Sequence, residues 1–336
     1  MNKPRVEAEH YIQFLVASPA AVSGTEAARV QAGGPLVAHD AYTRLLHRLE
    51  PDAQTLWQEA QGLVARTHGV LVLDDTTLDK PYARQMGLLT RHWSGKHHAV
   101  VQGINLLTLL WSDGQALVPV DYRLYEKAQD GLTKNDHFAH LLSAAQQRGF
   151  TPTCVLFDSW YASLANLKHV RSLGWPWLTR LKSNRLVRRD QGPLQALATL
   201  GGAVAQAGEV VWLKGYGLIR LLRLAAPDGG TDGVQYWASS EVALSAADRA
   251  AGAHLAWGIE QYHRGLKQCC GVEKAQVRAA RAQRNHIGCA MRAFSRLEMQ
   301  RLQTGRSWYE AKKQLLREAL RTYLANPVYV LHLPTA

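Results

Sequence analysis

The chain contains few cysteines and no pattern that would let them bind a metal together. Only four of its 336 residues are cysteines, and none of them forms a Cys-x-x-Cys pair: Cys154, Cys269, Cys270 and Cys289. Cys269 and Cys270 are adjacent in the chain, so the two cannot readily ligate one tetrahedral ion as a pair. We therefore expect reduced cysteines in the packed interior and no zinc site.

Long apolar runs are also absent. No stretch reaches the roughly 18 apolar residues of a membrane helix. Residues 1–32 lack the basic start, apolar stretch and small-residue cleavage site of a secretion signal. We therefore expect a soluble, cytoplasmic protein without a membrane partner. Hydrophobic residues make up 47% of the chain, enough for a sizeable core in one large domain with an insertion, or in two to three smaller domains.

Acidic residues are scarce in two segments, and this concentrates the net charge of +12. Residues 251–336 contain 14 Lys or Arg against 5 Asp or Glu, and residues 164–190 contain 7 against 1. Two positive blocks on a near-neutral body are typical of a surface that follows a polyanion such as DNA. A solvated basic helix surface is the alternative explanation.

Residues 1–65 are predicted to be helical. Thr25–Val30 reads as a short helix, the Gly33-Gly34-Pro35 turn ends it, and a helical pattern resumes over His39–Leu49. Two short helices around a glycine turn resemble a helix-turn-helix. A plain helical cap on a larger domain explains the same pattern equally well.

Apolar runs from residue 69 onward predict a sheet. Val70–Leu73 is predicted to be a short buried strand, and Asp74 and Asp75 follow directly at its C-terminal end. Residues 100–111 and 116–122 read as antiparallel neighbours around a Ser-Asp-Gly turn. A helix is expected over Asn135–Gly149, with Asn135 or Asp136 near its N-cap. The next strand, 153–157, ends in Asp158, and a helix at 163–173 and a strand at 177–181 follow.

Residues 185–245 interrupt this alternation of strands and helices. Three apolar runs separated by Gly-rich turns, at 210–213, 219–224 and 234–239, predict a β-rich insertion. From residue 246 to 324 the chain is expected to be helical almost throughout.

One late helix carries an acid beside two bases. On a helix over 253–268, Leu255, Ile259, Tyr262 and Leu266 form one apolar stripe. Glu260, Arg264 and Lys267 fall on a different stripe, one turn apart each. This spacing fits an i,i+4 ion pair on a solvated face. It also fits a metal ligand beside cations that hold phosphate.

Convergence of three acids favours the second interpretation. Two Mg²⁺ ions about 4 Å apart can activate an attacking oxygen and stabilise the leaving oxygen in a phosphodiester displacement. Mg²⁺ prefers oxygen ligands, which Asp and Glu supply. Clustered carboxylates without a counter-ion repel each other, so the cluster implies a bound metal.

Three passages resemble the DDE transposases of bacterial insertion sequences: Leu73–Leu78 (LDDTTL), Val155–Tyr161 (VLFDSWY) and Trp257–Gln268 (WGIEQYHRGLKQ). The resemblance covers roughly residues 69–300. It implies an α/β, ribonuclease-H-like mixed sheet flanked by helices, with a β-rich insertion. It also implies Asp75, Asp158 and Glu260 as catalytic metal ligands, Mg²⁺ as cofactor with Mn²⁺ as a substitute, and double-stranded DNA as partner.

One branch of this family has a Tyr-x2-Arg-x3-Glu-x6-Lys signature, of which Glu260 and Lys267 match the last two members. Ala253 and Ala256 stand where the Tyr and Arg would be. In the family those two residues help hold DNA phosphate, so their absence puts efficient strand transfer in doubt. Arg264 and Lys267 are the expected DNA-binding residues on this helix.

The first acid has two candidates. Asp74 and Asp75 are neighbours in a strand and point to opposite faces, so only one of them is expected to face the metal. Some family members place the acid directly before Thr-Thr, which selects Asp75 and leaves Asp74 as the second choice.

The sequence therefore predicts a transposase that cleaves DNA at element ends and joins them to target DNA, as a homodimer when bound to DNA. Two alternatives stay open: an impaired or domesticated copy that only binds DNA, and a nuclease of the same fold. The expected domains are a DNA-binding region at 1–65, a catalytic domain at 66–184 and 246–305, an insertion at 185–245 and a helical tail at 306–336.

Overall fold

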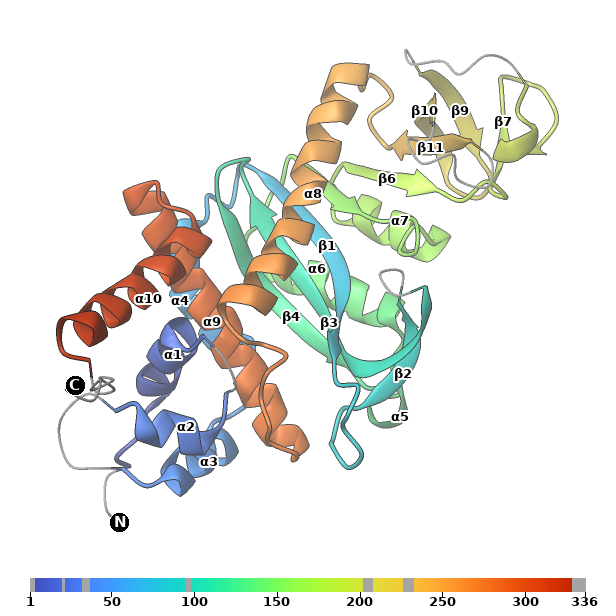
Figure 1. The fold of residues 1–336 in the computed structure, drawn as a ribbon. Coiled ribbons are helices and arrows are strands. Elements are labelled where there is room, and N and C mark those ends of the chain that lie inside the picture. Colours follow the sequence, from blue (N-terminus) through green and yellow to red (C-terminus); the bar gives the residue numbers. More distant parts are fainter. Residues whose placement is uncertain are drawn as a thin grey trace, which may run out of the picture. The chain divides into compact units, whose positions relative to one another are not determined.

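A computed structural model describes residues 4–19, 22–31, 37–94, 98–201, 208–225 and 233–327. The chain divides into two compact units (Figure 1). The first comprises residues 1–51, 85–87 and 264–336, and the second comprises residues 52–84 and 88–263. The expected turn at Gly33-Gly34-Pro35 and the end of the helical tail lie outside the described residues.

Helices and strands account for most of the described chain. The α-helices are α1 (Ala8–Ala17), α2 (Gly24–Arg29), α3 (His39–Arg48), α4 (Gln54–Ala60), α5 (Lys127–Asp130), α6 (Lys134–Gln147), α7 (Leu164–Ser172), α8 (Ala246–Cys269), α9 (Ala280–Thr304) and α10 (Trp308–Ala325). Two short 3-10 helices are η1 (Gln61–Leu63) and η2 (Leu197–Thr199). The strands are β1 (Val70–Asp79), β2 (Thr90–Ser94), β3 (Ala99–Ser112), β4 (Leu117–Tyr125), β5 (Cys154–Phe157), β6 (Trp177–Leu181), β7 (Leu186–Arg188), β8 (Gln195–Ala196), β9 (Glu209–Leu213), β10 (Gly217–Ala225) and β11 (Val234–Ser239).

All of these strands belong to one mixed sheet of the second unit, in the order β2-β3-β1-β5-β6-β11-β10-β9-β7-β8, with β4 paired to β3. β3 runs antiparallel to β1 and to β4. β5 runs parallel to β1 and to β6. The central order β4-β3-β1-β5-β6, with α6 and α7 as crossover helices, is the ribonuclease-H-like arrangement that the resemblance implied.

A cluster of buried residues covers one face of this sheet. Leu71 and Leu73 of β1 are fully buried in one cluster with Phe138 and Leu141 of α6 and Leu167 of α7. Side chains alternate between the faces of a strand, so the even-numbered residues of β1 lie on the opposite face.

Helix α8 covers that opposite face. Gly252 lies so close to the sheet that an added Cβ would stand 2.5 Å from a Leu178 methyl group and 3.9 Å from Leu156. Gly258 approaches Leu117 in the same way, with 2.8 Å to a methyl carbon. The glycines therefore let the α8 backbone lie directly on the sheet.

The predicted β-rich insertion is present, and its strands extend the same sheet. β11 pairs antiparallel with β6, β10 with β11, and β9 with β10. β7 then pairs with β9 and with β8. The strands β7 to β11 thus lengthen the central sheet at its β6 edge.

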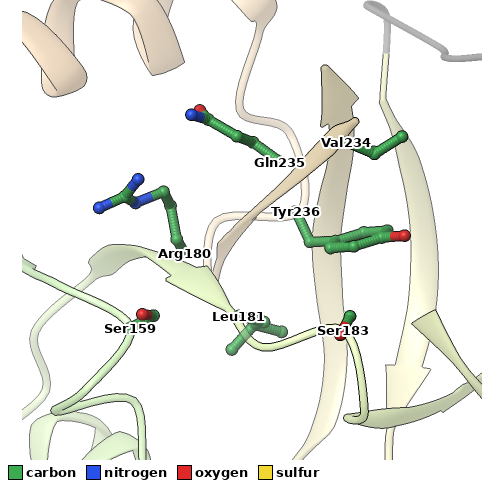
Figure 2. A pocket seen from close by; sticks show the side chains of 7 residues that line it. All are labelled: Ser159, Arg180, Leu181, Ser183, Val234, Gln235 and Tyr236. Atoms are coloured by element: carbon green, nitrogen blue, oxygen red, sulfur yellow. The ribbon is translucent and has the colours of Figure 1, made fainter. Parts of the chain in front are cut away.

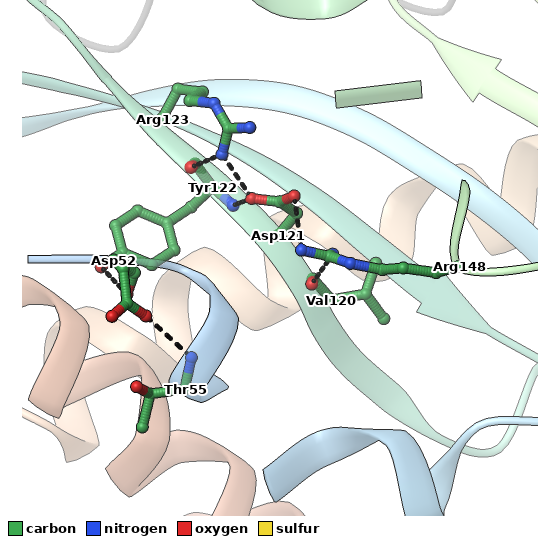
Figure 3. Close-up of polar contacts among 7 residues, drawn as sticks. All are labelled: Asp52, Thr55, Val120, Asp121, Tyr122, Arg123 and Arg148. Carbon is green, nitrogen blue, oxygen red and sulfur yellow. Dashed lines mark hydrogen bonds and ion pairs between the residues drawn. The ribbon is translucent and has the colours of Figure 1, made fainter. Parts of the chain in front are cut away.

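A buried ion cluster fixes the outer strand β4 (Figure 3). Asp121 is fully buried, and its carboxylate pairs with Arg123 at 2.5 Å and with Arg148 at 3.1 Å. Arg148, which follows α6, also donates to the Val120 carbonyl at 2.7 Å. The Tyr122 hydroxyl donates to the carbonyl of Asp52, just before α4. These contacts tie α4 and α6 to β4.

The first unit is helical. Tyr11 of α1 bonds to His286 of α9 through its hydroxyl, at 2.9 Å. Asn285 of α9 donates to two carbonyls at the end of α3, those of Leu46 and Leu49. The Lys312 ammonium of α10 donates to the Ser18 carbonyl at 2.9 Å. Helices from both ends of the chain therefore share one core.

Several predicted elements have different limits in the structure. β1 continues to Asp79, so the two acids lie within a strand and not at its end, because β3 pairs with β1 along its full length. The N-cap of α6 is Thr133, with Asp136 as its capping-box partner, so the expected cap at Asn135 or Asp136 is wrong. The long helical stretch is broken at 270–279 and 305–307.

Within the described part of the chain, no helix combines the length and the apolar composition of a membrane span.

Candidate active site

Strand register brings two acids together in the second unit. β5 pairs with β1 only over Val70–Leu73, and the last pair joins Leu73 to Phe157. Asp74 and Asp158 are the next residues on the two parallel strands. The parallel pairing therefore sets these two acids side by side at the point where β5 ends.

The two acids of β1 lie on opposite faces of the sheet. Asp75 shares the face of Leu73, which packs against α6, because side chains two residues apart point the same way. Asp74 shares the face that α8 covers. Adjacent acids of one strand are thus placed in two different environments.

On the α6 face, Asp75 is held by three partners. Its Oδ2 accepts hydrogen bonds from Asn105 at 2.7 Å and from the Lys134 ammonium at 2.7 Å. Its Oδ1 accepts from the Tyr161 hydroxyl at 2.5 Å. Burial alone would raise the pKa of Asp75, but Lys134 and the three hydrogen bonds outweigh it, and the pKa lies below its ordinary value. Asp75 is therefore a neutralised, fixed carboxylate.

Lys134 itself is enclosed by aromatic rings. Its ammonium lies 5.3 Å from the centre of the Trp160 ring and 5.7 Å from that of Tyr125. Only 16% of its side chain is exposed. The cation that neutralises Asp75 is thus held in place by ring contacts as well as by the ion pair.

On the α8 face, Asp74 lies among other acids. Burial, and then the negative charges of Asp75, Asp158 and Glu260, hold the pKa of Asp74 well above its ordinary value. Within the described residues, no Lys, Arg or His forms an ion pair with Asp74. Asp74 therefore lacks the cationic partner that Asp75 has.

The carboxylate of Asp158 is oriented by the turn that follows it. Its Oδ1 accepts from the backbone N–H of Trp160 at 2.8 Å and of Tyr161 at 3.3 Å. Burial raises the pKa of Asp158 in spite of these two bonds. The second oxygen, Oδ2, makes no hydrogen bond or ion pair with any described residue and is available to a ligand.

Glu260 stands on the exposed side of α8, which presents Ile259 and Tyr262 to the interior. Its negative charge contributes to the raised pKa of Asp74. No ion pair to Glu260 occurs among the described residues, so the alternative of an ion pair with Arg264 is not realised. The negative charges of Asp75, Asp158 and Glu260 all act on Asp74, while the side chain of Asp75 lies on the other face of β1.

Asp74, Asp158 and Glu260 suit a divalent cation by their chemistry. They offer only oxygen donors, which Mg²⁺ prefers, and their charge has no ion-pair partner among the described residues. In the described ranges, no three His, Cys, Asp or Glu side chains are close enough to hold one metal ion.

The remaining predicted residues lie further along α8. Lys267 pairs with Glu273 at 2.9 Å, and Arg264 is exposed. Both belong to the first compact unit, whereas the three acids belong to the second. Ala253 and Ala256, at the positions of the missing signature residues, are partly buried.

An open cleft adjoins the Asp158 turn (Figure 2). It has a volume of about 220 Å³ and is lined by Ser159, Arg180, Leu181, Ser183, Val234, Gln235 and Tyr236. Arg180 is exposed, and its guanidinium has no hydrogen-bond or ion-pair partner among the described residues. Its positive charge counteracts the raised pKa of Asp158, so an anion bound here would lie near the acids.

Sequence reasoning missed the partners of Asp75. Asn105, Lys134 and Tyr161 come from three separate segments, and no spacing links them to Asp75. Arg180 could have been predicted as a site residue, because its strand is the neighbour of the strand that Asp158 follows. The parallel pairing of these two strands would have placed it beside the site.

One family model and several solved structures match this chain. No curated protein matches the sequence. Among solved structures, a Mos1 transposase in a paired-end complex with the left transposon end aligns at 15% identity with a TM-score of 0.19. That alignment covers 52% of this chain and 59% of the Mos1 chain. The family model described as DDE superfamily endonuclease matches residues 2–205, a span that includes Asp74, Asp75 and Asp158 and ends before Glu260. The chain therefore belongs to the DDE superfamily of endonucleases.

Proposed function

We propose that this chain is a metal-dependent transposase whose catalytic acids are Asp74, Asp158 and Glu260. The observation that carries the proposal is the strand register, which places Asp74 next to Asp158 where β5 ends, while neither carboxyl group has an ion-pair partner among the described residues. A pair of carboxylates of this kind is unfavourable without a cation. A protein fold that maintains it has a use for that cation.

Asp74 replaces Asp75 as the first acid in this proposal. Asp75 already has a cation, Lys134, and hydrogen bonds to both of its oxygens. A metal ion would have to displace Lys134 to bind there. Asp74 needs no such exchange, and the negative charge of Glu260 acts on it.

Mg²⁺, with Mn²⁺ as a substitute, is the cation that these oxygen donors fit, and when bound it would activate a water and stabilise the leaving oxygen of a phosphodiester. The chain's own residues orient the Asp158 carboxylate and hold the DNA phosphate. The N–H groups of Trp160 and Tyr161 fix Oδ1 of Asp158 and leave Oδ2 open. Arg180, beside the acids, offers a guanidinium that can hold two oxygens of a DNA phosphate.

The reaction that we propose has two steps. Hydrolysis at the end of a mobile element frees a 3′-hydroxyl group, and that hydroxyl then attacks target DNA. No covalent protein–DNA bond is needed. The basic residues of 251–336, Arg264 and Lys267 included, would bind the backbone of the DNA end, and two copies of the chain would act together on two ends.

The experiment is plasmid cleavage in Mg²⁺, using a plasmid that carries the coding region with its flanking DNA. Asp74→Asn, Asp158→Asn and Glu260→Gln should each abolish cutting and leave DNA binding nearly intact, because a carboxamide keeps the shape but ligates the metal weakly. Asp113→Asn, a surface change of equal charge, is the matched control. Near wild-type cutting by the Asp158 or Glu260 variant would show that the site assignment is wrong.

A second candidate function is a DNA-binding protein that has lost turnover. Ala253 and Ala256 favour it, because the family signature has Tyr and Arg there to hold phosphate. A joining assay on pre-cut ends separates the two. Joining by the wild-type chain supports the transposase, whereas no joining by the wild type or by the Ala253→Tyr, Ala256→Arg double variant supports the binding protein.

A further inference from the structure

One face of the strands β7, β9 and β10 is exposed, apolar and basic. Trp212 is directly opposite Leu218 in the β9–β10 pair and opposite Arg188 in the β7–β9 pair. Val210 is opposite Arg220 in the next row. Directly paired residues share a face, so these five form one surface, which we call the outer strand face.

Large apolar side chains on this face are exposed to solvent. Leu218 is 58% exposed, Val210 43% and Trp212 39%. The alternate residues Val211, Leu213, Ile219 and Leu221 are buried in the core on the other side. Because the sheet already has a complete core on one side, the exposed apolar group is free to meet a ligand.

An arginine lies beside the Trp212 ring on this face. The Arg188 guanidinium lies 5.2 Å from the centre of the Trp212 ring, and its Nε has no hydrogen-bond partner among the described residues. The one acid in the strands β6, β7, β9, β10 and β11 is Glu209. It points to the core side, where it pairs with Arg189 and Arg223. Among the described strand residues of the outer strand face, the charged ones are Arg188 and Arg220, and both are positive.

On the same side of the sheet, further residues lie between the outer strand face and the cleft beside Asp158. Trp237 of β11 is opposite Arg180 of β6, and Leu222 of β10 is opposite Trp237. Arg180 lines the cleft beside Asp158. The guanidinium of Arg249 lies 5.7 Å from the centre of the Trp237 ring. A second arginine–tryptophan pair therefore lies between the outer strand face and that cleft.

We propose that the outer strand face binds an unpaired segment of a DNA strand, with a base stacked on Trp212 and its phosphates near Arg188 and Arg220. This rests on the proposed function, because it assigns a surface to the DNA on which the acids act. Charge complementarity selects a polyanion. Exposed indole and aliphatic side chains select open base faces, which a duplex keeps stacked inside.

The proposal is tested by measuring how the full chain binds oligonucleotides in EDTA. The probes are a fluorescent dT20 strand and a 20-base-pair duplex, compared by anisotropy at one salt concentration. Trp212→Ala should weaken dT20 binding roughly tenfold, as loss of one stacked base does, and change duplex binding less than twofold. Trp212→Phe should keep most of the affinity, because a phenyl ring still stacks. Tyr82→Ala removes a ring that is 95% exposed elsewhere and should change nothing.

Three results would overturn the proposal. The first is wild-type dT20 affinity in the folded Trp212→Ala variant. The second is an equal loss for dT20 and duplex, which would indicate general charge attraction. The third is a change from dimer to monomer in Trp212→Ala with dT20 affinity unchanged, which would make the face a contact between two copies. Because these measurements exclude metal, a chain that stacks dT20 on Trp212 but never cuts plasmid DNA would refute the proposed function and support the strand-binding face.

Discussion

Neutralising Asp74 and Asp75 one at a time should have opposite effects on stability. Asp75→Asn leaves Lys134 without its ion-pair partner, and both side chains are largely buried, with 20% and 16% exposure. Breaking a fully buried pair costs about 3–5 kcal/mol. The remaining exposure lowers the expected loss to about 2–3 kcal/mol, which is about 5–10 °C in melting temperature for a unit of this size.

Asp74→Asn should instead leave the metal-free melting temperature unchanged or raise it. The substitution removes a charge that burial and three neighbouring acids disfavour. It should also remove the response to metal. At a concentration 100-fold above its dissociation constant, a ligand stabilises the folded state by about 2.7 kcal/mol. Wild type should therefore gain about 5–10 °C in Mg²⁺ or Mn²⁺, and Asp74→Asn should gain little.

Thermal unfolding of the full chain in EDTA and in excess MgCl₂ or MnCl₂ measures both effects. Asp75→Asn should start lower than wild type and keep the metal-induced gain. Asp113→Asn, on an exposed turn, should behave as wild type in both conditions. The opposite pattern, with the metal response lost in Asp75→Asn and kept in Asp74→Asn, would refute the assignment of Asp74 to the metal-facing side of the strand.

Four further outcomes are expected. Asp121→Asn should destabilise the chain by about 3 kcal/mol or more, measured by urea denaturation, because it leaves two arginines without their buried partner. Pairing with Arg189 lowers the pKa of Glu209, so the stability advantage of wild type over Glu209→Gln should be full above about pH 4.3 and disappear as the pH falls below it. Gly252→Ala should cost about 1–3 kcal/mol in the same denaturation assay, because its Cβ would press on a buried leucine. In a filter-binding titration of duplex DNA, log affinity should fall linearly with log salt at a slope near −5, as about six phosphate contacts require; a flat dependence would remove the argument from charge.

The order of strands and helices was largely predictable from periodicity. The apolar runs at 70–73, 153–157 and 177–181 correspond to β1, β5 and β6, and the three runs of the β-rich segment correspond to β9, β10 and β11. These strands are short and strongly apolar, so each has one obvious interpretation. The paired strands at 100–111 and 116–122 are likewise present as β3 and β4.

Boundaries were less predictable, because tertiary pairing sets them. Polar residues follow Leu73, so the apolar run stops there, yet β3 supplies backbone partners as far as Asp79. The ends of α8 and α9 could have been predicted from the glycines that follow them. Gly271 and Gly305 adopt positive φ values of 62° and 70°, a conformation that ends helices and favours glycine.

The choice between Asp74 and Asp75 shows what a single sequence leaves out. Val70, Leu71, Val72 and Leu73 are all buried, two on each face of β1, so the run has no polar–apolar alternation from which to read the direction of the next side chain. The strand register supplies the missing information, since Leu73 belongs to the α6 core and Asp75 must share its side. Two identical side chains, one residue apart, then have opposite electrostatic roles. Asp75 is held by Lys134 and Tyr161, whereas Asp74 has no cationic partner among the described residues and burial raises its pKa, which favours its protonated form.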